Sequence, residues 1–274
     1  MKIIRTILVL VLSCFIGVGA FTSCKKDVGP DVPAALLVKA IGETASKTYS
    51  SDYSYDNQGR CIKEDYSDPS ETLTDTYSYS ENQIIWVRDV KSEEDGDYTN
   101  RMVIELDEYG RFKKGTDEDK VRTVLYDGDG HLIKDATVYH DAPSDISEQE
   151  FEWKDGDMLK HTATFEVGNI HSTSTTEYTY GDKPYQLHPQ DGFILWNGIV
   201  FTRALGKMPV HQPLSCRVTT VRNIGGNIST IVKTKRFDYQ YDANGRIVGV
   251  DIFVDEDTTP GTKLTFIWAS RQIG

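Results

Sequence analysis

The most regular feature of the chain is the alternation of apolar and polar residues in short runs. Met102, Ile104 and Leu106 fall on one side of an extended run, whereas Val103 and Glu105 fall on the other. Successive side chains of a β-strand point to opposite faces, so this period predicts strands with one packed face and one wet face. Runs of this kind recur along the chain and predict an all-β fold.

The runs are separated by a recurring turn. An aromatic residue usually ends the preceding run, an acidic or polar residue opens the turn, and a glycine follows before the next run. Asp can cap its own turn, and Gly adopts the left-handed conformation that other residues resist, so each unit predicts a β-hairpin with a bulge. The units are Tyr53–Arg60, Leu106–Phe112, Tyr126–Leu132, Phe151–Gly156 and Phe237–Ile247, with weaker copies at Tyr77–Asn82 and Tyr178–Asp182.

Serial hairpins of this length predict a single antiparallel meander of about 14 to 16 strands over residues 35–274. A sheet of that size must curl to bury its apolar face, so we expect an open, strongly curved sheet, or partial barrel. The pattern breaks at about residues 185–213, where Asp191 to Gly206 is apolar without strict alternation. Asp191 can cap a helix that Gly206 ends, which predicts a short helix or apolar insert in the concave face.

The amino terminus carries a targeting signal. Lys2 and Arg5 precede an apolar stretch, Ile7 to Gly19, that is too short to span a bilayer, and small residues then lead to Cys24. This arrangement predicts a lipoprotein signal peptide over residues 1–23, lipidation of Cys24 and a tether over residues 24–34. An ordinary secretory signal cut near Gly19–Ala20 is the alternative.

The net charge limits the classes of partner, and the cysteine content limits the possible disulfides. The sequence has 42 acidic residues against 30 basic ones, a net charge of −12, which argues against nucleic acid or anionic lipid surfaces as partners, because either would be repelled. Beyond Cys24 only Cys61 and Cys216 remain. An oxidising envelope permits a disulfide between them, whereas isolated cysteines are also common as buried thiols, and the sequence leaves both open.

The motif Tyr241–Ile247 resembles the tyrosine-aspartate (YD/RHS-type) repeat of large bacterial surface and toxin proteins. Together with Cys24, the opening run Leu36–Lys39 and the segment Leu205–Pro209, the chain resembles a domain-of-unknown-function family of Bacteroidota lipoproteins with a porin-like fold. This resemblance implies a partial barrel of antiparallel strands and no established activity.

Signatures of catalysis are absent from the sequence, which contains no G-x-S-x-G, H-E-x-x-H, Walker loop or C-x-x-C motif. Asp127–Gly130 looks like the start of a calcium loop, but its twelfth position is Val138 where an acid is needed. A hairpin turn explains the segment better. We therefore expect no catalytic, cofactor or metal residues.

Two weaker sites are candidates. Aromatic rings near the irregular insert, Trp153, Tyr185 and Trp196, are a candidate platform for a glycan, although cross-strand packing explains most rings in the chain. Asp257-Thr258-Thr259 resembles a short O-glycosylation acceptor, with Thr258 as the modified residue.

These features favour a non-enzymatic, lipid-anchored protein of the outer membrane and cell envelope that presents a curved β-sheet for binding or structural interaction. A glycan or nutrient-binding accessory lipoprotein of an outer-membrane uptake system is the first alternative, and an unrecognised hydrolase is the second. The expected partners are the membrane, through the lipid, and a glycan or envelope protein, with no cofactor. The sequence leaves a periplasmic or surface-facing orientation open.

Overall fold

The structure is a computed structural model that describes residues 35–93, 96–186 and 204–270. Every element of this part of the chain is a β-strand, and the sixteen strands follow one another along the sequence. Their bounds are β1 Ala35–Thr44, β2 Thr48–Tyr55, β3 Cys61–Ser67, β4 Glu71–Tyr79, β5 Gln83–Ser92, β6 Tyr98–Leu106, β7 Phe112–Thr116, β8 Lys120–Tyr126, β9 Leu132–Tyr139, β10 Ile146–Lys154, β11 Asp157–Val167, β12 Ile170–Pro184, β13 His211–Ile224, β14 Asn227–Tyr241, β15 Ile247–Val254 and β16 Thr262–Ser270.

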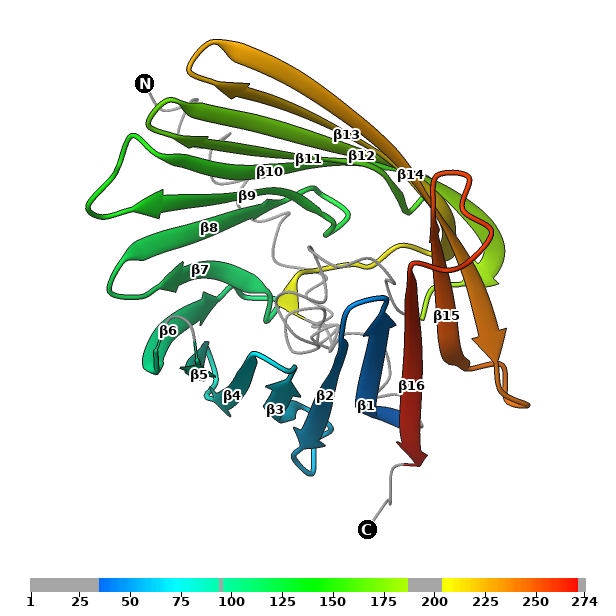
Figure 1. Cartoon of the computed structure of the whole chain (residues 1–274). Helices are drawn as coiled ribbons and strands as arrows, with labels where there is room; N and C mark the ends of the chain where they lie inside the picture. Colours follow the sequence, from blue (N-terminus) through cyan, green and yellow to red (C-terminus); the bar gives the residue numbers. More distant parts are fainter. Residues whose placement is uncertain (1–34, 94–95, 187–203, 271–274) are drawn as a thin grey trace, which may run out of the picture. The chain divides into compact units, whose positions relative to one another are not determined.

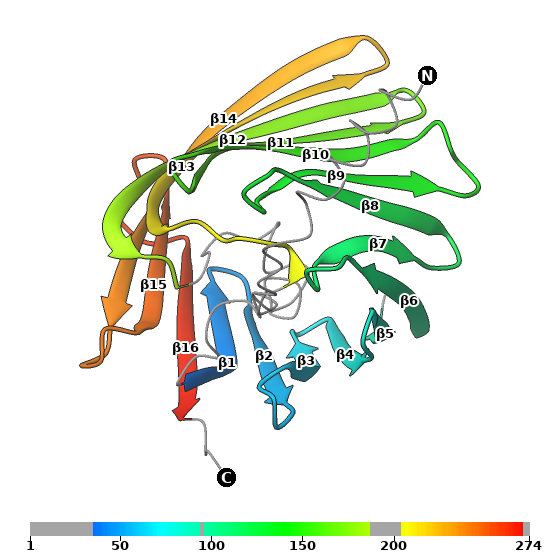
Figure 2. The same ribbon diagram turned by 180° about the vertical axis from the view of Figure 1, so that it is seen from behind.

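The strands form one closed antiparallel barrel in chain order (Figures 1 and 2). Closure comes from β1, which pairs with β2 on one side and β16 on the other, so that Ala40 lies opposite both Ser51 and Phe266. The expectation of an open partial barrel is therefore wrong. An open sheet would leave β1 and β16 as unpaired edges, and their pairing satisfies the backbone groups of both.

The predicted insert is described only in part. Residues 187–203, on which most of the expected helix falls, lie outside the described residues, and the described elements include no helix. Ala204 and Leu205 are buried in the hydrophobic cluster of the barrel, and Lys207 N–H donates to the carbonyl of Gly130 at 2.9 Å. The predicted turn at Gly181 is also wrong, because β12 continues to Pro184.

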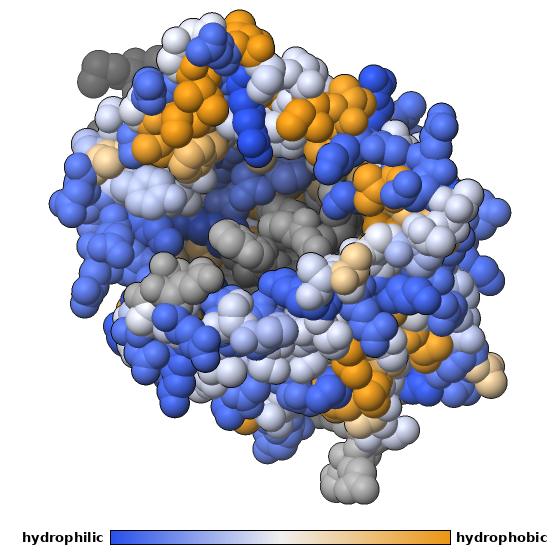
Figure 3. Space-filling model, in the orientation of Figure 1, coloured by the Kyte–Doolittle hydropathy of each residue, from blue (hydrophilic) through white to orange (hydrophobic). Residues whose placement is uncertain are grey.

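The barrel turns its apolar side chains inward. On β4, Asp75 and Tyr77 are buried, whereas Thr72 and Ser78 are exposed. The inward cluster includes Phe112, Ile104 and Ile247, none of which has measurable exposure. The face of the molecule seen in Figure 3 is hollowed at its centre and mostly hydrophilic, with hydrophobic patches separated by hydrophilic residues. In the described segments we find no helix with the length and hydropathy of a membrane span.

The turn chemistry predicted from the sequence is confirmed at four hairpins. In the first, Asp56 Oδ1 accepts hydrogen bonds from Gln58 N and Arg60 N, both at 2.9 Å, and Asp56 Oδ2 accepts one from Arg60 Nε at 2.7 Å. Gly59 has a φ of 74°, in the left-handed region. The turns that start at Asp107, Asp127 and Asp242 repeat this pattern, with His131 in place of arginine in the second of them.

Seven of the described strands carry a β-bulge near their start, namely the odd-numbered strands except β5. At β3, for example, Cys61 lies opposite Tyr55, but Lys63 lies opposite Ser54. An aromatic side chain at the end of the next strand donates a hydrogen bond to the carbonyl of the first bulge residue. The donor and acceptor pairs are Tyr55 and Leu37, Tyr79 and Cys61, Tyr126 and Phe112, Trp153 and Leu132, Tyr180 and Met158, Tyr239 and Pro213, and Trp268 and Ile247.

The exception supports a link between bulge and donor. β5 pairs with β4 and β6 without any register shift, and the residue at the end of β6 is Leu106. A bulge disturbs the ladder locally, and a buried carbonyl without a partner costs about 1–3 kcal/mol. The aromatic donors therefore satisfy backbone groups at one end of the barrel, which explains the aromatic residues that precede most turns.

Candidate functional site

A polar row crosses the otherwise apolar interior on β2 to β5. Tyr53 lies opposite Glu64, Glu64 opposite Asp75, and Asp75 opposite Arg88. Arg88 donates two hydrogen bonds to Asp75, from Nε to Oδ1 at 2.8 Å and from Nη2 to Oδ2 at 2.7 Å. Glu64 and Asp75 are only 8% and 1% exposed, so the row holds two buried carboxyls beside one guanidinium.

Glu64 is the titratable member of this row. Burial raises the pKa of its carboxyl to about 7, and the nearby Asp75 adds to the rise, whereas hydrogen bonds with Ser51 and Tyr53 and the Arg88 charge lower it. Desolvation disfavours the charged form of a carboxyl, and a neighbouring carboxylate does the same. Glu64 can therefore take up or release a proton near neutral pH.

A second polar group lies on β8 to β11. Arg122 Nε donates to both carboxylate oxygens of Asp135, at 2.9 and 3.0 Å, and Asp135 is 2% exposed. On β11, His161 Nε2 lies 2.8 Å from Gln149 Oε1, and its ring stacks on Phe151 with centroids 4.8 Å apart. Burial lowers the pKa of His161 to about 4, against a smaller opposing effect of Asp135. His161 is therefore neutral at physiological pH.

The two thiols offer no activated nucleophile. Cys61 and Cys216 are both free and buried. Of the two possibilities that the sequence left open, a disulfide and buried thiols, the structure has the buried thiols. Cys61 Sγ donates to the carbonyl of Lys63 at 3.3 Å. Burial raises the pKa of the Cys216 thiol to about 11, which keeps it protonated and unreactive.

One group of side chains has the composition of a metal site. Potential ligand atoms of Asp127, Asp129 and His131 lie within 4.8 Å of one another. However, Asp127 Oδ1 already accepts hydrogen bonds from Asp129 N and His131 N, and Asp127 Oδ2 lies 3.1 Å from His131 Nδ1. The same contacts recur at turns where arginine replaces His131. The structure therefore supports the sequence-based interpretation of this segment as a hairpin turn.

A hollow opens at the end of the barrel opposite the aromatic donors. Its volume is about 320 Å³, and it combines carboxylates with aromatic and small apolar side chains. The sequence did not single it out, because its residues come from three separate loops and strand ends. The lining residues are Asp119, Tyr139, Asp141, Ala142, Asp145, Phe165 and Val167.

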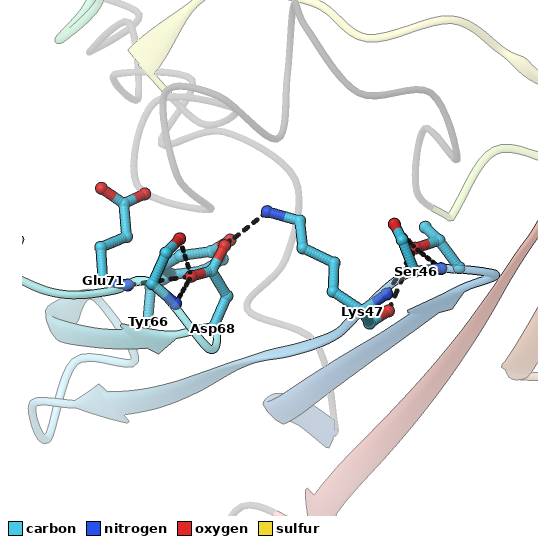
Figure 4. A network of polar contacts seen from close by, with 7 residues as sticks. Ser46, Lys47, Tyr66, Asp68 and Glu71 are labelled. Atoms are coloured by element: carbon cyan, nitrogen blue, oxygen red, sulfur yellow. Dashed lines mark hydrogen bonds and ion pairs between the residues drawn. The ribbon is translucent and has the colours of Figure 1, made fainter. Parts of the chain in front are cut away.

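A polar network at the same end of the strands joins the β1–β2 and β3–β4 turns (Figure 4). Lys47 Nζ and Tyr66 Oη donate to Asp68 Oδ2 at 2.5 and 3.1 Å, and the backbone N–H groups of Ser70 and Glu71 donate to Asp68 Oδ1. Burial alone would raise the pKa of Asp68, but the hydrogen bonds from Lys47 and Ser70 hold it well below its usual value. Through these contacts the Asp68 carboxylate connects the β1–β2 turn to the β3–β4 turn.

The candidate residues from the sequence lie apart from that hollow. Trp153 is the penultimate residue of β10, whose other end adjoins Asp145, and its indole stacks on His131 with centroids 4.6 Å apart. Tyr185 follows β12 and donates its backbone N–H to the carbonyl of Val210. Thr258 lies on the exposed β15–β16 turn. Cys24 and Trp196 lie outside the described residues, so lipidation and the aromatic platform stay predictions.

No protein-family model matches the chain, and no curated protein does so either. The barrel is similar to the crystal structure of a porin-like protein from Bacteroides vulgatus, with a TM-score of 0.58 and 14% identity over 85% of this chain and 98% of that chain. The fold is porin-like. A porin-like protein from Bacteroides uniformis is also similar, with a TM-score of 0.51 and 13% identity over 88% of this chain and 98% of that chain. These likenesses confirm the all-β, porin-like fold that the sequence resemblance implied.

Proposed function

We propose that this chain is a non-enzymatic, lipid-anchored protein of the outer membrane and cell envelope whose barrel binds or organises another envelope component. The observation that carries the proposal is the packed core at the aromatic-donor end of the porin-like barrel. Phe112, Met158 and Leu205 are each at most 1% exposed inside it. Side chains that fill the lumen at this end serve as a core and leave the loops, the opposite end and the outward face for interaction.

The outward face argues for attachment through a lipid. Barrels that cross a membrane carry an outward apolar band with aromatic girdles and a polar interior. Here the described strands show no continuous band of this kind: Thr72, Thr74 and Thr76 on β4, and Glu148 and Glu150 on β10, face outward, and exposed apolar residues such as Ile62 and Ile133 lie on other strands. Such a surface suits water, so the membrane contact falls to the predicted lipid on Cys24.

The buried titratable groups support a role without catalysis. Asp75 and Asp135 are held by Arg88 and Arg122, and His161 is half-buried and neutral. Glu64 titrates near neutral pH, but its described partners are Ser51 and other members of the polar row. Catalysis by general acid and base needs a group that reaches a substrate, and these groups are directed into a packed interior.

Detergent partitioning of the expressed full chain tests the anchor. In Triton X-114 we expect the wild type in the detergent phase and Cys24→Ala in the aqueous phase, with Cys14→Ala as the matched control that behaves like the wild type. Retention of Cys24→Ala in the detergent phase, or loss of Cys14→Ala from it, would contradict the assignment. Proteinase K treatment of intact cells, with lysed cells as control, then distinguishes surface display, which leads to degradation, from a periplasmic orientation, which protects the chain.

The hollow at the end of the barrel opposite the aromatic donors favours glycan binding as a second candidate function. Tyr139 and Phe165 supply aromatic faces, and Asp119, Asp141 and Asp145 supply acceptors for hydroxyl groups. Aromatic stacking combined with a few polar groups is a general mode of small-ligand recognition. This hollow adds an alternative to the platform at Trp153, Tyr185 and Trp196.

Binding to a polysaccharide panel distinguishes the two locations. If the hollow binds glycan, Phe165→Ala abolishes binding and Trp196→Ala retains it, with both variants folded by circular dichroism. The opposite result supports the platform. Absence of binding by the wild type across the panel would exclude this second function.

A further inference from the structure

The β13–β14 hairpin extends beyond β15 at one end of the barrel (Figures 1 and 2), whereas on its other side β12 pairs with β13 as far as Ile224. β14 pairs with β15 only from Lys235 onward, and Thr234 is hydrogen bonded to Asp255 of the β15–β16 turn. The residues before it, Asn227–Lys233, pair with β13 alone. Every residue of Asn227–Thr234 is exposed, and so are Val221 and Ile224 on β13. This half of the hairpin therefore presents both of its faces to the surroundings.

The end of the hairpin is apolar. Ile224 and Ile228 flank the Gly225–Gly226 turn with exposed fractions of 50% and 72%, and Ile231 and Val232 follow with 46% each. Ile231 and Val232 are adjacent on one strand, so they point to opposite faces. A groove on a protein would cover one face only, whereas lipid surrounds an inserted tip on both.

The same hairpin is basic within an acidic protein. Residues 211–237 contain Arg217, Arg222, Lys233, Lys235 and Arg236 and no Asp or Glu, although the whole chain has a net charge of −12. Arg236 pairs with Asp238 at 3.3 Å, whereas the other four form no ion pair with a described residue. Four cations are thus available to a partner that carries negative charge.

The order of these residues specifies the partner. Ile224 and Ile228 are nearest the turn. Arg222, which pairs with Ser229, lies about 10 Å behind the turn at roughly 3.3 Å per residue, and Lys233 lies about 25 Å behind it, with Ile231 and Val232 between these two cations. We propose that the β13–β14 hairpin docks on an anionic lipid surface, with its apolar tip at the boundary of headgroups and acyl chains and its basic residues among the phosphates. Apolar burial and attraction to anionic headgroups combine in this mode of binding. The acidic remainder of the barrel is repelled by such a surface, which restricts contact to the hairpin.

This inference is independent of the lipid on Cys24, and its test removes that lipid. The full chain carries Cys14→Ser and Cys24→Ser, with an environment-sensitive NBD fluorophore on Ile228→Cys; Cys61 and Cys216 are buried. The control carries the label on Ala243→Cys, an exposed residue of the β14–β15 turn at the other end of β14. Vesicles of phosphatidylcholine with and without phosphatidylglycerol contain a doxyl lipid as a membrane-restricted quencher.

We expect a blue shift and quenching of the label at residue 228 in anionic vesicles, loss of both effects in neutral vesicles or high salt, and no effect at residue 243. A label at residue 228 that stays in water, or equal effects at the two residues, would overturn the proposal. Strand pairing between two copies through the open edge of β14 is the competing outcome. It would give a dimer in gel filtration without vesicles and no quenching at residue 228.

Charge removal tests the basic component. We expect Arg222→Gln with Lys233→Gln to weaken binding to anionic vesicles about tenfold or more, since each cation near such a surface contributes appreciably. Lys113→Gln with Lys114→Gln on β7 is the matched control with the same change in net charge and unchanged binding. Equal weakening by both pairs would show a nonspecific charge effect and overturn the assignment to the hairpin.

Discussion

The interior of the barrel contains two polar regions that share one motif and differ in their third member. In both, an arginine holds a buried aspartate on a neighbouring strand, as Arg88 and Asp75 on β5 and β4, and Arg122 and Asp135 on β8 and β9. Beside the first pair lies an acid, Glu64, whereas the imidazole of His161 is near the second. The comparison teaches that the ion pair is the structural unit, and that the third group determines how each region responds to pH.

Breaking either ion pair should have the largest effect. Asp75→Ala leaves the Arg88 charge without its carboxylate in the interior, and loss of one partner of a buried pair costs about 3–5 kcal/mol of unfolding free energy. Asp135→Ala should cost a similar amount. Urea unfolding of each variant measures the loss.

Asp65→Ala is the matched control, because Asp65 pairs with Lys63 on the surface and an exposed pair contributes less than about 1 kcal/mol. The double variant Asp75→Leu with Arg88→Met should recover part of the loss, since it removes both charges together. An Asp75→Ala variant as stable as Asp65→Ala would contradict a structural role for the pair.

The third members should give opposite pH dependence. Glu64 has a raised pKa in the folded state, so folding retains a proton that the unfolded chain loses, and its contribution to stability declines as the pH rises from about 4.5 to about 7. His161 has a lowered pKa, so its contribution declines as the pH falls from about 6.5 to about 4. Each change amounts to about 3 kcal/mol, and the two nearly cancel between pH 4.5 and 6.5.

Single variants should reveal each contribution. Urea unfolding of Glu64→Gln between pH 4.5 and 7.5 should show stability that rises with pH, because only the His161 contribution remains. His161→Gln should show stability that falls with pH. If both variants retain the wild-type profile, neither group is responsible for it.

Much of the fold follows from local chemistry in the sequence. The turn at Asp56 was predictable from neighbouring residues alone. The aspartate accepts hydrogen bonds from backbone N–H groups of the turn, and the glycine three residues later adopts the left-handed conformation that the turn requires. Closure of the barrel was not predictable, because it depends on the pairing of Ala40 with Phe266, and no pattern of neighbouring residues connects positions so far apart in the sequence. Gly181 shows the reverse failure, since a turn-like sequence stays in a strand, within an irregular stretch between the pairs that Tyr180 and Pro184 form with β13.

The polar row was only partly predictable. Asp75 alternates in phase with Leu73 and Tyr77, and Arg88 with Trp86 and Ile84, so both fall on the apolar face of their strands. The burial of Glu64 does not follow from alternation, because the bulge at Cys61 reverses the alternation of side chains within β3. Strict alternation of side chains from the buried Cys61 would place Glu64 on the outward face, whereas the structure buries Glu64 beside Asp75.

The bulges allow the smallest and most selective test. Tyr79 on β4, in the acid-containing region, donates its hydroxyl to the carbonyl of Cys61 at 2.6 Å, the first bulge residue of β3. Tyr79→Phe retains the ring and its contact with Arg60 and removes only the donor, so we expect a loss of about 1–2 kcal/mol in urea unfolding. Tyr109→Phe, at an exposed tyrosine, is the control and should be neutral. Equal stability of the two variants would mean that the carbonyl of Cys61 is satisfied without Tyr79, and that the pairing of bulges with aromatic donors reflects packing of the rings alone.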